Sequence, residues 1–251
     1  MHLRGATVLI TGGSSGIGAA TARAITAAGA RPLVAGRDPQ RLDTVAAQTG
    51  GVALIADLAA PRGAHDLVDA ALRAAPTGID VLVNNAGIGW AGPFGDLPAA
   101  VEEQLVAVNL TAPLRLTRLL APAMARRGRG HVVFVSSIAG ATGVRREAAY
   151  AATKAGVHYF AESIRYELAG SGAGVSVVFP GVIDTRFFER RGTPYERNRP
   201  APISPERVAR GILAAIEGNR AEVFVPGWLR YPASLRGAAP GLFRSLTGRF
   251  G

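Results

Sequence analysis

The sequence predicts a single-domain α/β protein built on a doubly wound parallel sheet of about seven strands, with helices on both faces. Short apolar runs alternate along the chain with segments of helical periodicity, and strict β–α alternation implies right-handed crossovers between parallel strands. The apolar runs are continuous in Val, Ile and Leu rather than alternating with polar residues, as in strands that helices bury on both faces. No linker or shift in composition divides the chain, so we expect one domain.

The predicted elements follow one another in regular order. Strand character is found over 6–11 (ATVLIT), 31–36 (RPLVAG), 51–56 (GVALIA), 80–87 (DVLVNNAG), 131–137 (HVVFVSS), 174–181 (GVSVVFPG) and 221–226 (AEVFVP). Helices are predicted over 16–29, 39–50, 62–75, 99–127, 149–169 and 204–217. A chain of 251 residues buries enough surface to fold without a disulfide or a structural metal.

Composition argues against several classes of function. The chain has no cysteine, which excludes disulfides, thiol catalysis and thiolate metal sites, and we predict no metal site. The net charge is +10, but the arginines are spread along the chain without the basic block of a nucleic-acid-binding protein, so we predict no nucleic-acid partner. The apolar run near the N-terminus is too short for a signal peptide or a membrane span, and we expect a cytoplasmic protein.

A glycine-rich loop follows the first predicted strand. The stretch TGGSSGIG, residues 11–18, leads directly into a predicted helix and contains Gly12, Gly16 and Gly18. In this setting backbone N–H groups and the positive end of the helix bind a dinucleotide pyrophosphate, and side chains would block its approach. The spacing differs from the common G-x-G-x-x-G. The strand–loop–helix context therefore carries the prediction of a Rossmann-type cofactor site.

The end of the second predicted strand should lie beside the adenosine ribose. An acidic residue usually occupies this position in NAD sites, whereas this chain has Gly36 and then Arg37. An arginine can bind a 2′-phosphate with two hydrogen bonds, and the missing carboxylate removes a repulsion. We therefore favour NADPH, with Asp38 either reading a ribose or starting the next helix. Asp57 follows the third strand, where it could contact the adenine or simply cap a helix.

The stretch YAATK, residues 150–154, contains the only lysine of the chain. Residues four apart lie on one face of a helix, so Tyr150 and Lys154 should point the same way. A free tyrosine has a pKa of about 10 and is a poor acid or base at neutral pH. A neighbouring ammonium group favours the phenolate, so we expect Lys154 to lower the pKa of Tyr150 toward the working pH.

Taken together, these motifs resemble those of the common type of short-chain dehydrogenase/reductase. The resemblance covers about residues 5–226 and rests on TGGSSGIG, on NNAG (84–87), on Asn109 in AVNLTAP, on Ser137 in VSSIAG, on Tyr150 with Lys154, and on PGVIDT (180–185). Ser137 precedes Tyr150 by 150 − 137 = 13 positions, the usual interval of the family. The motifs occur in order and at family spacing, which makes the resemblance specific.

The resemblance implies a role for each matching residue. Tyr150 would be the general acid in reduction or the base in oxidation, Ser137 would hydrogen-bond the substrate oxygen, and Lys154 would also bind the nicotinamide ribose. Asn109 would hold a water that passes protons to Lys154. The implied cofactor-binding residues are Gly12, Ser14, Ser15, Gly16, Ile17, Gly18, Arg37, Asp57, Leu58, Asn85, Ala86, Gly87, Tyr150, Lys154, Pro180, Gly181, Val182, Ile183 and Thr185.

Two segments near the C-terminus fall outside these motifs. Residues 184–204 are charged and proline-bearing, and a loop of this length is usually functional; we predict a lid over the substrate, with Phe187, Phe188 and Tyr195 as apolar contacts. Trp90 and Phe94 could face the same cleft or pack ordinarily. Residues 227–251 form a basic amphipathic tail. It could bind a membrane surface, but its two prolines break any long helix and favour packing on the 1–226 domain or on a neighbouring subunit.

The sequence therefore predicts an NADPH-dependent oxidoreductase that transfers hydride between nicotinamide and a ketone or aldehyde, or the secondary alcohol in reverse. The class would be that of NAD(P)-dependent alcohol dehydrogenases and carbonyl reductases. The alternatives are an NAD-linked alcohol dehydrogenase using NADH/NAD+, and a non-catalytic nucleotide-binding protein on the same fold. The partner would be a small carbonyl or alcohol substrate, and the family resemblance implies a homodimer or homotetramer.

Overall fold

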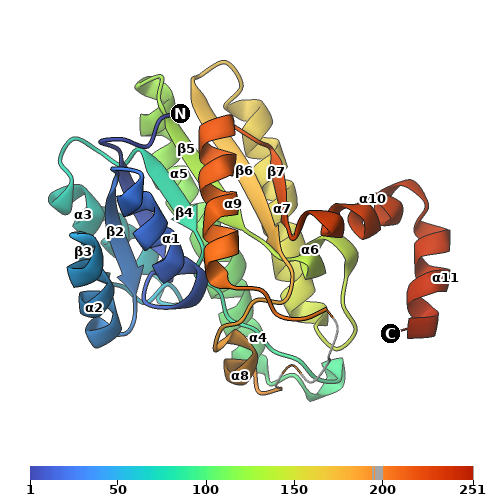
Figure 1. Ribbon diagram of the computed structural model, residues 1–251. Coiled ribbons are helices and arrows are strands. Elements are labelled where there is room, and N and C mark those ends of the chain that lie inside the picture. The colour runs from blue at the N-terminus through green and yellow to red at the C-terminus, as the bar shows by residue number, and fades with distance from the viewer. Residues whose placement is uncertain (194, 196–199, 251) are drawn as a thin grey trace.

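The computed structural model describes residues 1–193, 195 and 200–250, with the side chains of 247–250 excepted. All seven expected strands are present and pair in parallel, in the order β3-β2-β1-β4-β5-β6-β7. Helices cover both faces of this sheet (Figure 1). The predicted fold class is therefore confirmed, as a doubly wound Rossmann-type sheet in one domain.

The strand bounds differ from the predicted ones by a few residues at most. They are β1 Thr7–Thr11, β2 Arg31–Gly36, β3 Val52–Ile55, β4 Val81–Asn84, β5 Gly130–Val135, β6 Ala173–Pro180 and β7 Glu222–Val225. The main helices are α1 Gly16–Ala27, α2 Pro39–Thr49, α3 Gly63–Ala74, α4 Ala99–Val106, α5 Ala112–Arg126, α7 Ala148–Glu167 and α9 Pro205–Gly218. Shorter elements are η1 Phe94–Asp96, η2 Ala107–Thr111, α6 Ile138–Thr142, α8 Phe187–Arg190 and η3 Gly227–Leu229.

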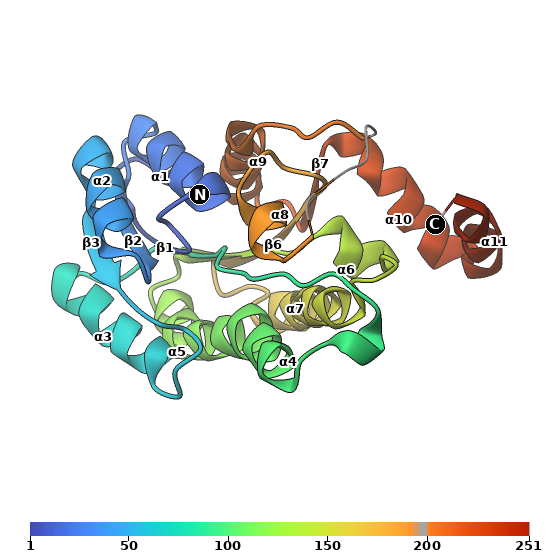
Figure 2. The same cartoon turned by 90° about the horizontal axis from the view of Figure 1, so that it is seen from below.

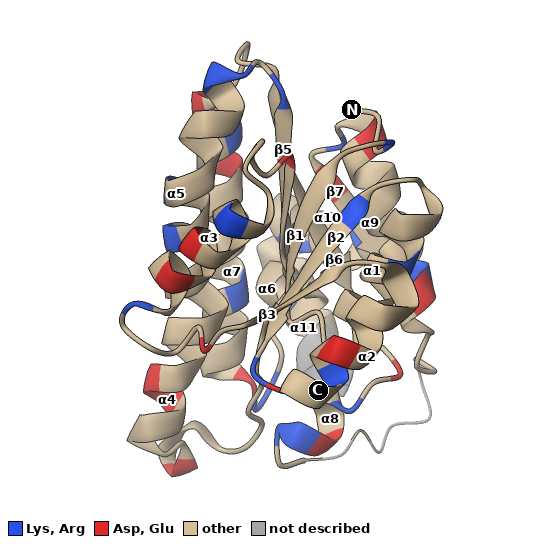
Figure 3. Cartoon of the chain, turned by 90° about the vertical axis from the view of Figure 1, so that its left-hand side faces the viewer, with Lys and Arg blue, Asp and Glu red and all other residues tan. Residues whose placement is uncertain are grey.

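Two hydrophobic cores lie on opposite faces of the sheet. Helices α1, α2 and α9 cover one face and α3, α5 and α7 the other (Figure 2). Successive strand residues point to alternate faces, so within β1 Val8 and Ile10 belong to the first core and Leu9 to the second. Charged residues of both signs gather on the helices and loops, and the sheet between them is largely free of them (Figure 3). This burial on both faces explains the continuous apolar runs of the sequence.

The topology directs the functional loops to one edge of the sheet. Because all the strands are parallel, the loops that follow β1 to β6 all leave from the carboxyl edge. The strand order reverses between β1 and β4, and ligands of open α/β sheets bind in the crevice at such a switch point. The loop of residues 12–15 and the loop after Asn84 begin at this point.

The chain after β7 forms two short helices, α10 Arg230–Ala238 and α11 Pro240–Phe250. Pro240 begins α11, so no long helix forms, as the prolines predicted. Helix α10 packs against α6 and α11 packs against α10, and both project from the body of the domain in Figure 1. Among the described residues, no helix combines the length and apolarity that crossing a bilayer requires.

Candidate active site

The glycine loop after β1 is shaped so that its backbone can approach a ligand. Gly12 and Gly16 have positive φ angles of 65° and 53°, a region that glycine adopts readily. A Cβ on Gly18 would lie 2.2 Å from the carbonyl oxygen of Gly12, so only glycine lets helix α1 start this close to the loop. Ser15 is the N-cap of α1, and its side chain makes no bond to the helix. The loop therefore suits a pyrophosphate.

Hydrogen bonds join this loop to the NNAG segment after β4. The side-chain amide of Asn85 donates to the carbonyl oxygens of Thr11 and Gly12, at 2.8 and 3.2 Å. The hydroxyl of Thr11 accepts from the backbone N–H groups of Asn85 and Ala86, at 3.0 Å each. Thr11 was not predicted to have this role, although it lies at the end of the predicted first strand. The two loops thus form one rigid wall at the switch point.

The acidic residues near the predicted ribose position are engaged in local structure. Asp38 is the N-cap of α2: its carboxylate accepts from the backbone N–H of Arg41 at 3.1 Å and pairs with the Arg41 side chain at 3.0 Å. The Asp57 carboxylate accepts from the backbone N–H of Ala59 at 3.0 Å. Arg37 follows the last residue of β2 and is exposed. A cationic side chain, rather than a carboxylate, is therefore presented at this position.

The side chains of Ser137, Tyr150 and Lys154 come together beneath the carboxyl edge of β5. Ser137 caps α6, and its hydroxyl shares a hydrogen bond with the Tyr150 phenol. The Lys154 Nζ donates to the Val135 carbonyl at 2.9 Å and lies 5.9 Å from the centroid of the Tyr150 ring. Tyr150 and Lys154 are buried, with 7% and 5% of their surface exposed. Helix α7 therefore presents both to one centre, as their spacing predicted.

The expected lowering of the Tyr150 pKa is wrong for this structure. Burial raises the pKa of Tyr150 well above its ordinary value, although the Ser137 hydrogen bond opposes this shift. The carboxylate of Glu147 raises that pKa further and the guanidinium of Arg191 lowers it. Burial also lowers the pKa of Lys154 to about 8. Desolvation of the phenol therefore raises the pKa of Tyr150, in the direction opposite to that expected from the neighbouring Lys154 ammonium group.

Asn109 lies in a π-helical turn, η2, which interrupts the long predicted helix. Its side chain bonds Ile88 in both directions, accepting from the N–H and donating to the carbonyl at 2.9 Å each, and donates to the Thr153 hydroxyl at 3.1 Å. Single π turns inside α-helices are often found at functional sites. Here the turn brings Asn109 against the loop after β4, near Lys154: a Cβ on Gly87 would lie 3.4 Å from Asn109 Oδ1 and 3.3 Å from Lys154 Nζ.

The loop after β6 approaches the glycine loop across the edge of the sheet. The backbone N–H of Gly181 donates to Val225 at 2.9 Å, and Ile183 forms a bridge with Ile203. These contacts direct Thr185 to the glycine loop, where a Cβ on Gly16 would lie 3.0 Å from its methyl carbon. The predicted cofactor residues Ser14, Ile17, Ala86, Pro180 and Val182 lie on or beside the loops after β1, β4 and β6, and Leu58 lies in the loop after β3. The glycine loop and the loop after β6 both contain glycine, so a dinucleotide could lie close to their backbone.

One part of the predicted lid packs on the Tyr150 centre, and residues 194 and 196–199 of that lid lie outside the described residues. Phe187, at the start of α8, packs on Tyr150 with a ring-centroid distance of 5.5 Å. Phe188 contacts the rings of Phe187 and Tyr195, at 5.6 and 5.3 Å. Trp90 packs against the same apolar cluster, whereas Phe94 is 65% exposed.

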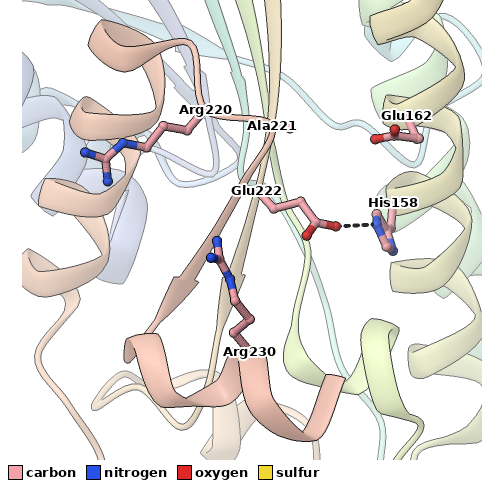
Figure 4. A pocket seen from close by; sticks show the side chains of 6 residues that line it. All are labelled: His158, Glu162, Arg220, Ala221, Glu222 and Arg230. Atoms are coloured by element: carbon pink, nitrogen blue, oxygen red, sulfur yellow. Dashed lines mark hydrogen bonds and ion pairs between the residues drawn. The ribbon is translucent and has the colours of Figure 1, made fainter. Parts of the chain in front are cut away.

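A separate polar cavity lies away from this centre, beside the edge strand β7. Its volume is about 560 Å³, and its lining residues are His158, Glu162, Arg220, Ala221, Glu222 and Arg230 (Figure 4). His158 Nε2 and Glu222 Oε1 are 3.0 Å apart, and this hydrogen bond lowers the pKa of Glu222. None of these residues was predicted to be catalytic.

Comparison with known proteins identifies the family. The family model described as short chain dehydrogenase matches residues 6–196. The chain belongs to the short-chain dehydrogenase/reductase family. Dehydrogenase/reductase SDR family member 7B of Xenopus laevis is 32% identical over 98% of this chain and 81% of its own length. The ketoacyl reductase HetN of Nostoc is 35% identical over 89% of this chain and 79% of its own length.

Solved structures of short-chain dehydrogenases share the fold over most of both chains. A short-chain dehydrogenase from Sphingobium yanoikuyae in complex with NADPH has a TM-score of 0.83 and 32% identity, with 94% of each chain covered. A metagenomic short-chain oxidoreductase in complex with NADP has a TM-score of 0.73 and 35% identity, covering 89% of this chain and 98% of that one. The recognition drawn from the motifs is thus confirmed.

Proposed function

We propose that this short-chain dehydrogenase is an NADPH-dependent oxidoreductase that interconverts a ketone or aldehyde and the corresponding alcohol. The observation that carries the proposal is the set of the half-buried Ser137 and the buried Tyr150 and Lys154, placed on the same sheet edge as the glycine loop. The nicotinamide would supply or accept the hydride. Tyr150 would give its phenolic proton to the substrate oxygen, and the Ser137 hydroxyl would donate a hydrogen bond to that oxygen as negative charge develops.

The preference for NADPH rests on the residues at the end of β2. Arg37 is exposed there, while the Asp38 carboxylate is held by Arg41. Asp38 is thus occupied as a helix cap, which argues against the alternative in which it reads the ribose of NAD. Two structural relatives with more than 30% identity are complexes with NADPH and NADP, which supports the same preference.

The raised Tyr150 pKa fits the direction of carbonyl reduction. A phenol that holds its proton at neutral pH is ready to act as an acid, and for oxidation it must first lose that proton. One relative is named a ketoacyl reductase, and Phe187 packs on Tyr150 with Phe188 behind it. We therefore propose an apolar or acyl-chain ketone as the substrate class and reduction as the favoured direction.

The test is a panel of carbonyl compounds, β-ketoacyl thioesters included, followed by loss of NADPH absorbance. Tyr150→Phe should abolish turnover, about 1,000-fold or more, because it removes the acidic hydroxyl and keeps the ring that packs on Phe187. NADPH should still bind to the variant with near-parental affinity. Retained turnover in Tyr150→Phe would refute the assignment of the acid, and NADPH binding without turnover on any compound would favour the non-catalytic alternative.

We also propose a cytoplasmic homodimer or homotetramer that assembles through the helices carrying Asn109 and Tyr150. The support is the outer face of α7, where Tyr159 and Tyr166 are 71% and 70% exposed and lie seven residues apart, two turns along one helix face. Sedimentation of Tyr159→Glu with Tyr166→Glu should show smaller particles than the parent. An unchanged sedimentation coefficient would contradict this choice of interface.

A further inference from the structure

A buried ion pair connects the lid to the start of the catalytic helix. Arg191 is the C-cap of α8, Glu147 is the N-cap of α7, and the Arg191 guanidinium pairs with the Glu147 carboxylate. Their side chains are only 8% and 16% exposed, so water screens the pair little. Tyr150 follows Glu147 by three residues. The pair therefore joins two segments that are 44 residues apart in the sequence.

Arg191 is held from further sides as well. Its Nε donates to the Thr193 carbonyl at 2.9 Å, and its guanidinium lies 4.7 Å from the centroid of the Phe188 ring. The Thr193 hydroxyl donates to the Ala91 carbonyl at 3.0 Å, which links the lid to the loop after β4. That loop is itself bonded to the segment before α7, because the Gly92 N–H donates to Arg146 at 2.9 Å. Arg191 thus stands at the junction of three segments.

These contacts determine where Phe187 lies. Helix α8 has only four residues, too few to be stable by itself. Phe187 nevertheless packs on Tyr150, and a Cβ on Gly89 would lie 2.6 Å from the Phe187 ring. The ring belongs to an apolar cluster that also includes Leu105, Tyr150 and Trp90. Because the Phe187 ring packs on Tyr150, the position of α8 affects how open the phenol is to a substrate.

We propose that the Glu147–Arg191 ion pair is a clasp that positions the lid, holding Phe187 on Tyr150 and thereby controlling the entry of the carbonyl substrate to the acid. The proposal deepens the proposed function and rests on it for the identity of the acid. Glu147 and Arg191 act through Phe187 and the charge environment of Tyr150, so they are positioning residues. Removing one partner of a buried pair leaves the other charge uncompensated, so each single variant should loosen the lid.

The same pair has opposite electrostatic effects on the phenol. Four groups face Tyr150: the Ser137 hydroxyl from α6, the Lys154 ammonium from α7, and the two members of the clasp. Glu147 raises the pKa of Tyr150 and Arg191 lowers it. If the pair acted only by holding the lid, removing either partner would shift the pKa of Tyr150 in the same direction. Opposite shifts in the two variants would therefore show a direct electrostatic effect of the pair on Tyr150, which a purely structural role lacks.

Quenching of Trp90 fluorescence tests the position of the lid without any turnover. The chain has two tryptophans, so Trp228→Phe leaves Trp90 as the only reporter. In that background Arg191→Met and Glu147→Gln should each raise the acrylamide quenching constant of Trp90 about twofold or more, as an uncompensated buried charge opens the lid. Arg190→Met is the matched control, because Arg190 is an exposed arginine of the same helix. Equal quenching in all three variants would overturn the clasp.

The rate of alcohol oxidation tests the effect on Tyr150. The rate follows the ionised fraction of the phenol, which is small at about pH 9 because burial raises the pKa of Tyr150. At this pH Arg191→Met should lower the rate and Glu147→Gln should raise it, each by about tenfold. Arg190→Met should leave the rate unchanged. Rate changes of the two clasp variants in the same direction would overturn the proposed role near Tyr150. If quenching rises as expected but no variant or parent turns over any carbonyl, the clasp stands and the proposed function fails.

Discussion

The glycine loop and the Tyr150 centre lie on one sheet edge but are built from different parts of the chain. The loop uses backbone: Gly12 and Gly16 adopt positive φ angles and Gly18 lets α1 start against the Gly12 carbonyl. The centre uses side chains: Tyr150 and Lys154 are almost fully buried, and Phe187 packs on Tyr150. One region is open to its ligand and the other is closed over its reactive groups.

This difference separates binding from chemistry. A ligand that binds to backbone needs free space and correctly directed N–H groups. Adding side-chain atoms there should therefore weaken binding more than removing them. A buried proton donor depends on desolvation and on the few charges around it, so changes of charge damage it most. Substitutions in the loop should therefore change cofactor affinity, and substitutions in the centre should change turnover.

After Tyr150→Phe, the largest effect is expected from Lys154→Arg. Lys154 Nζ lies 2.9 Å from the Val135 carbonyl, and a Cβ on Gly87 would lie 3.3 Å from it. The planar guanidinium cannot replace a compact ammonium group in this space. We expect turnover to fall about 100-fold or more at saturating NADPH, followed by absorbance. If Lys154→Arg kept half of the parental turnover, a positive charge alone would be sufficient at this position. The Tyr150 centre would then not depend on precise side-chain geometry, contrary to the proposed difference from the glycine loop.

The pH dependence of the parent sharpens the same prediction. Burial lowers the pKa of Lys154 to about 8, so the amine is protonated below this pH and loses its charge as the pH rises through it. Carbonyl reduction should therefore decline above about pH 8. The activity left in Lys154→Arg should show no such decline, because a guanidinium keeps its proton in this range. A parallel decline in both proteins would assign it to another group.

The next largest effect is expected from Gly18→Ala. The added Cβ would lie 2.2 Å from the Gly12 carbonyl oxygen and 2.7 Å from the Asn85 amide, so the loop must move. We expect NADPH to bind about 100-fold more weakly, since hydrogen bonds to its phosphates are lost. Titration of NADPH fluorescence measures this affinity, and thermal unfolding shows whether the variant folds.

Two further glycine variants control this experiment. Gly95→Ala meets nothing within 4 Å and should bind NADPH as the parent does. Gly16→Ala meets only the Thr185 side chain, whose methyl carbon is nearest at 3.0 Å, but Gly16 has a φ of 53°. The variant should therefore weaken binding while keeping the fold. Parental affinity in both Gly16→Ala and Gly18→Ala would place the cofactor elsewhere.

The sequence predicted the elements of the fold well because their signals are local. The seven strands were found from runs such as VLI at 8–10, and glycine and proline marked their ends. The glycine loop and the Tyr150–Lys154 pair were found for the same reason, since each lies within eight consecutive residues. Thr11 was missed as a partner of the NNAG loop because its hydrogen bonds cross two strands that meet only in the folded sheet.

Properties that depend on distant packing could not be predicted in this way. The Tyr150 pKa was expected to fall because a lysine was visible four residues away, but burial governs it, and that burial includes Phe187 from the lid. The Glu147–Arg191 pair spans 44 positions, and neither residue belongs to a family motif. The only local signal was the place of Glu147, one turn before Tyr150.

The smallest effect is expected from Arg37→Ala, which tests whether the open region also reads the cofactor with one exposed side chain. Arg37 should bind the 2′-phosphate of NADPH, which NADH lacks, so its loss should weaken NADPH binding about tenfold and leave NADH binding nearly unchanged. Arg41→Ala is the matched control, because that arginine lies one turn away and is paired with Asp38. In the contrary outcome, the parent binds NADH as tightly as NADPH, with neither affinity changed in Arg37→Ala. That result would show that Arg37 does not bind the 2′-phosphate and that the exposed end of β2 does not select NADPH over NADH.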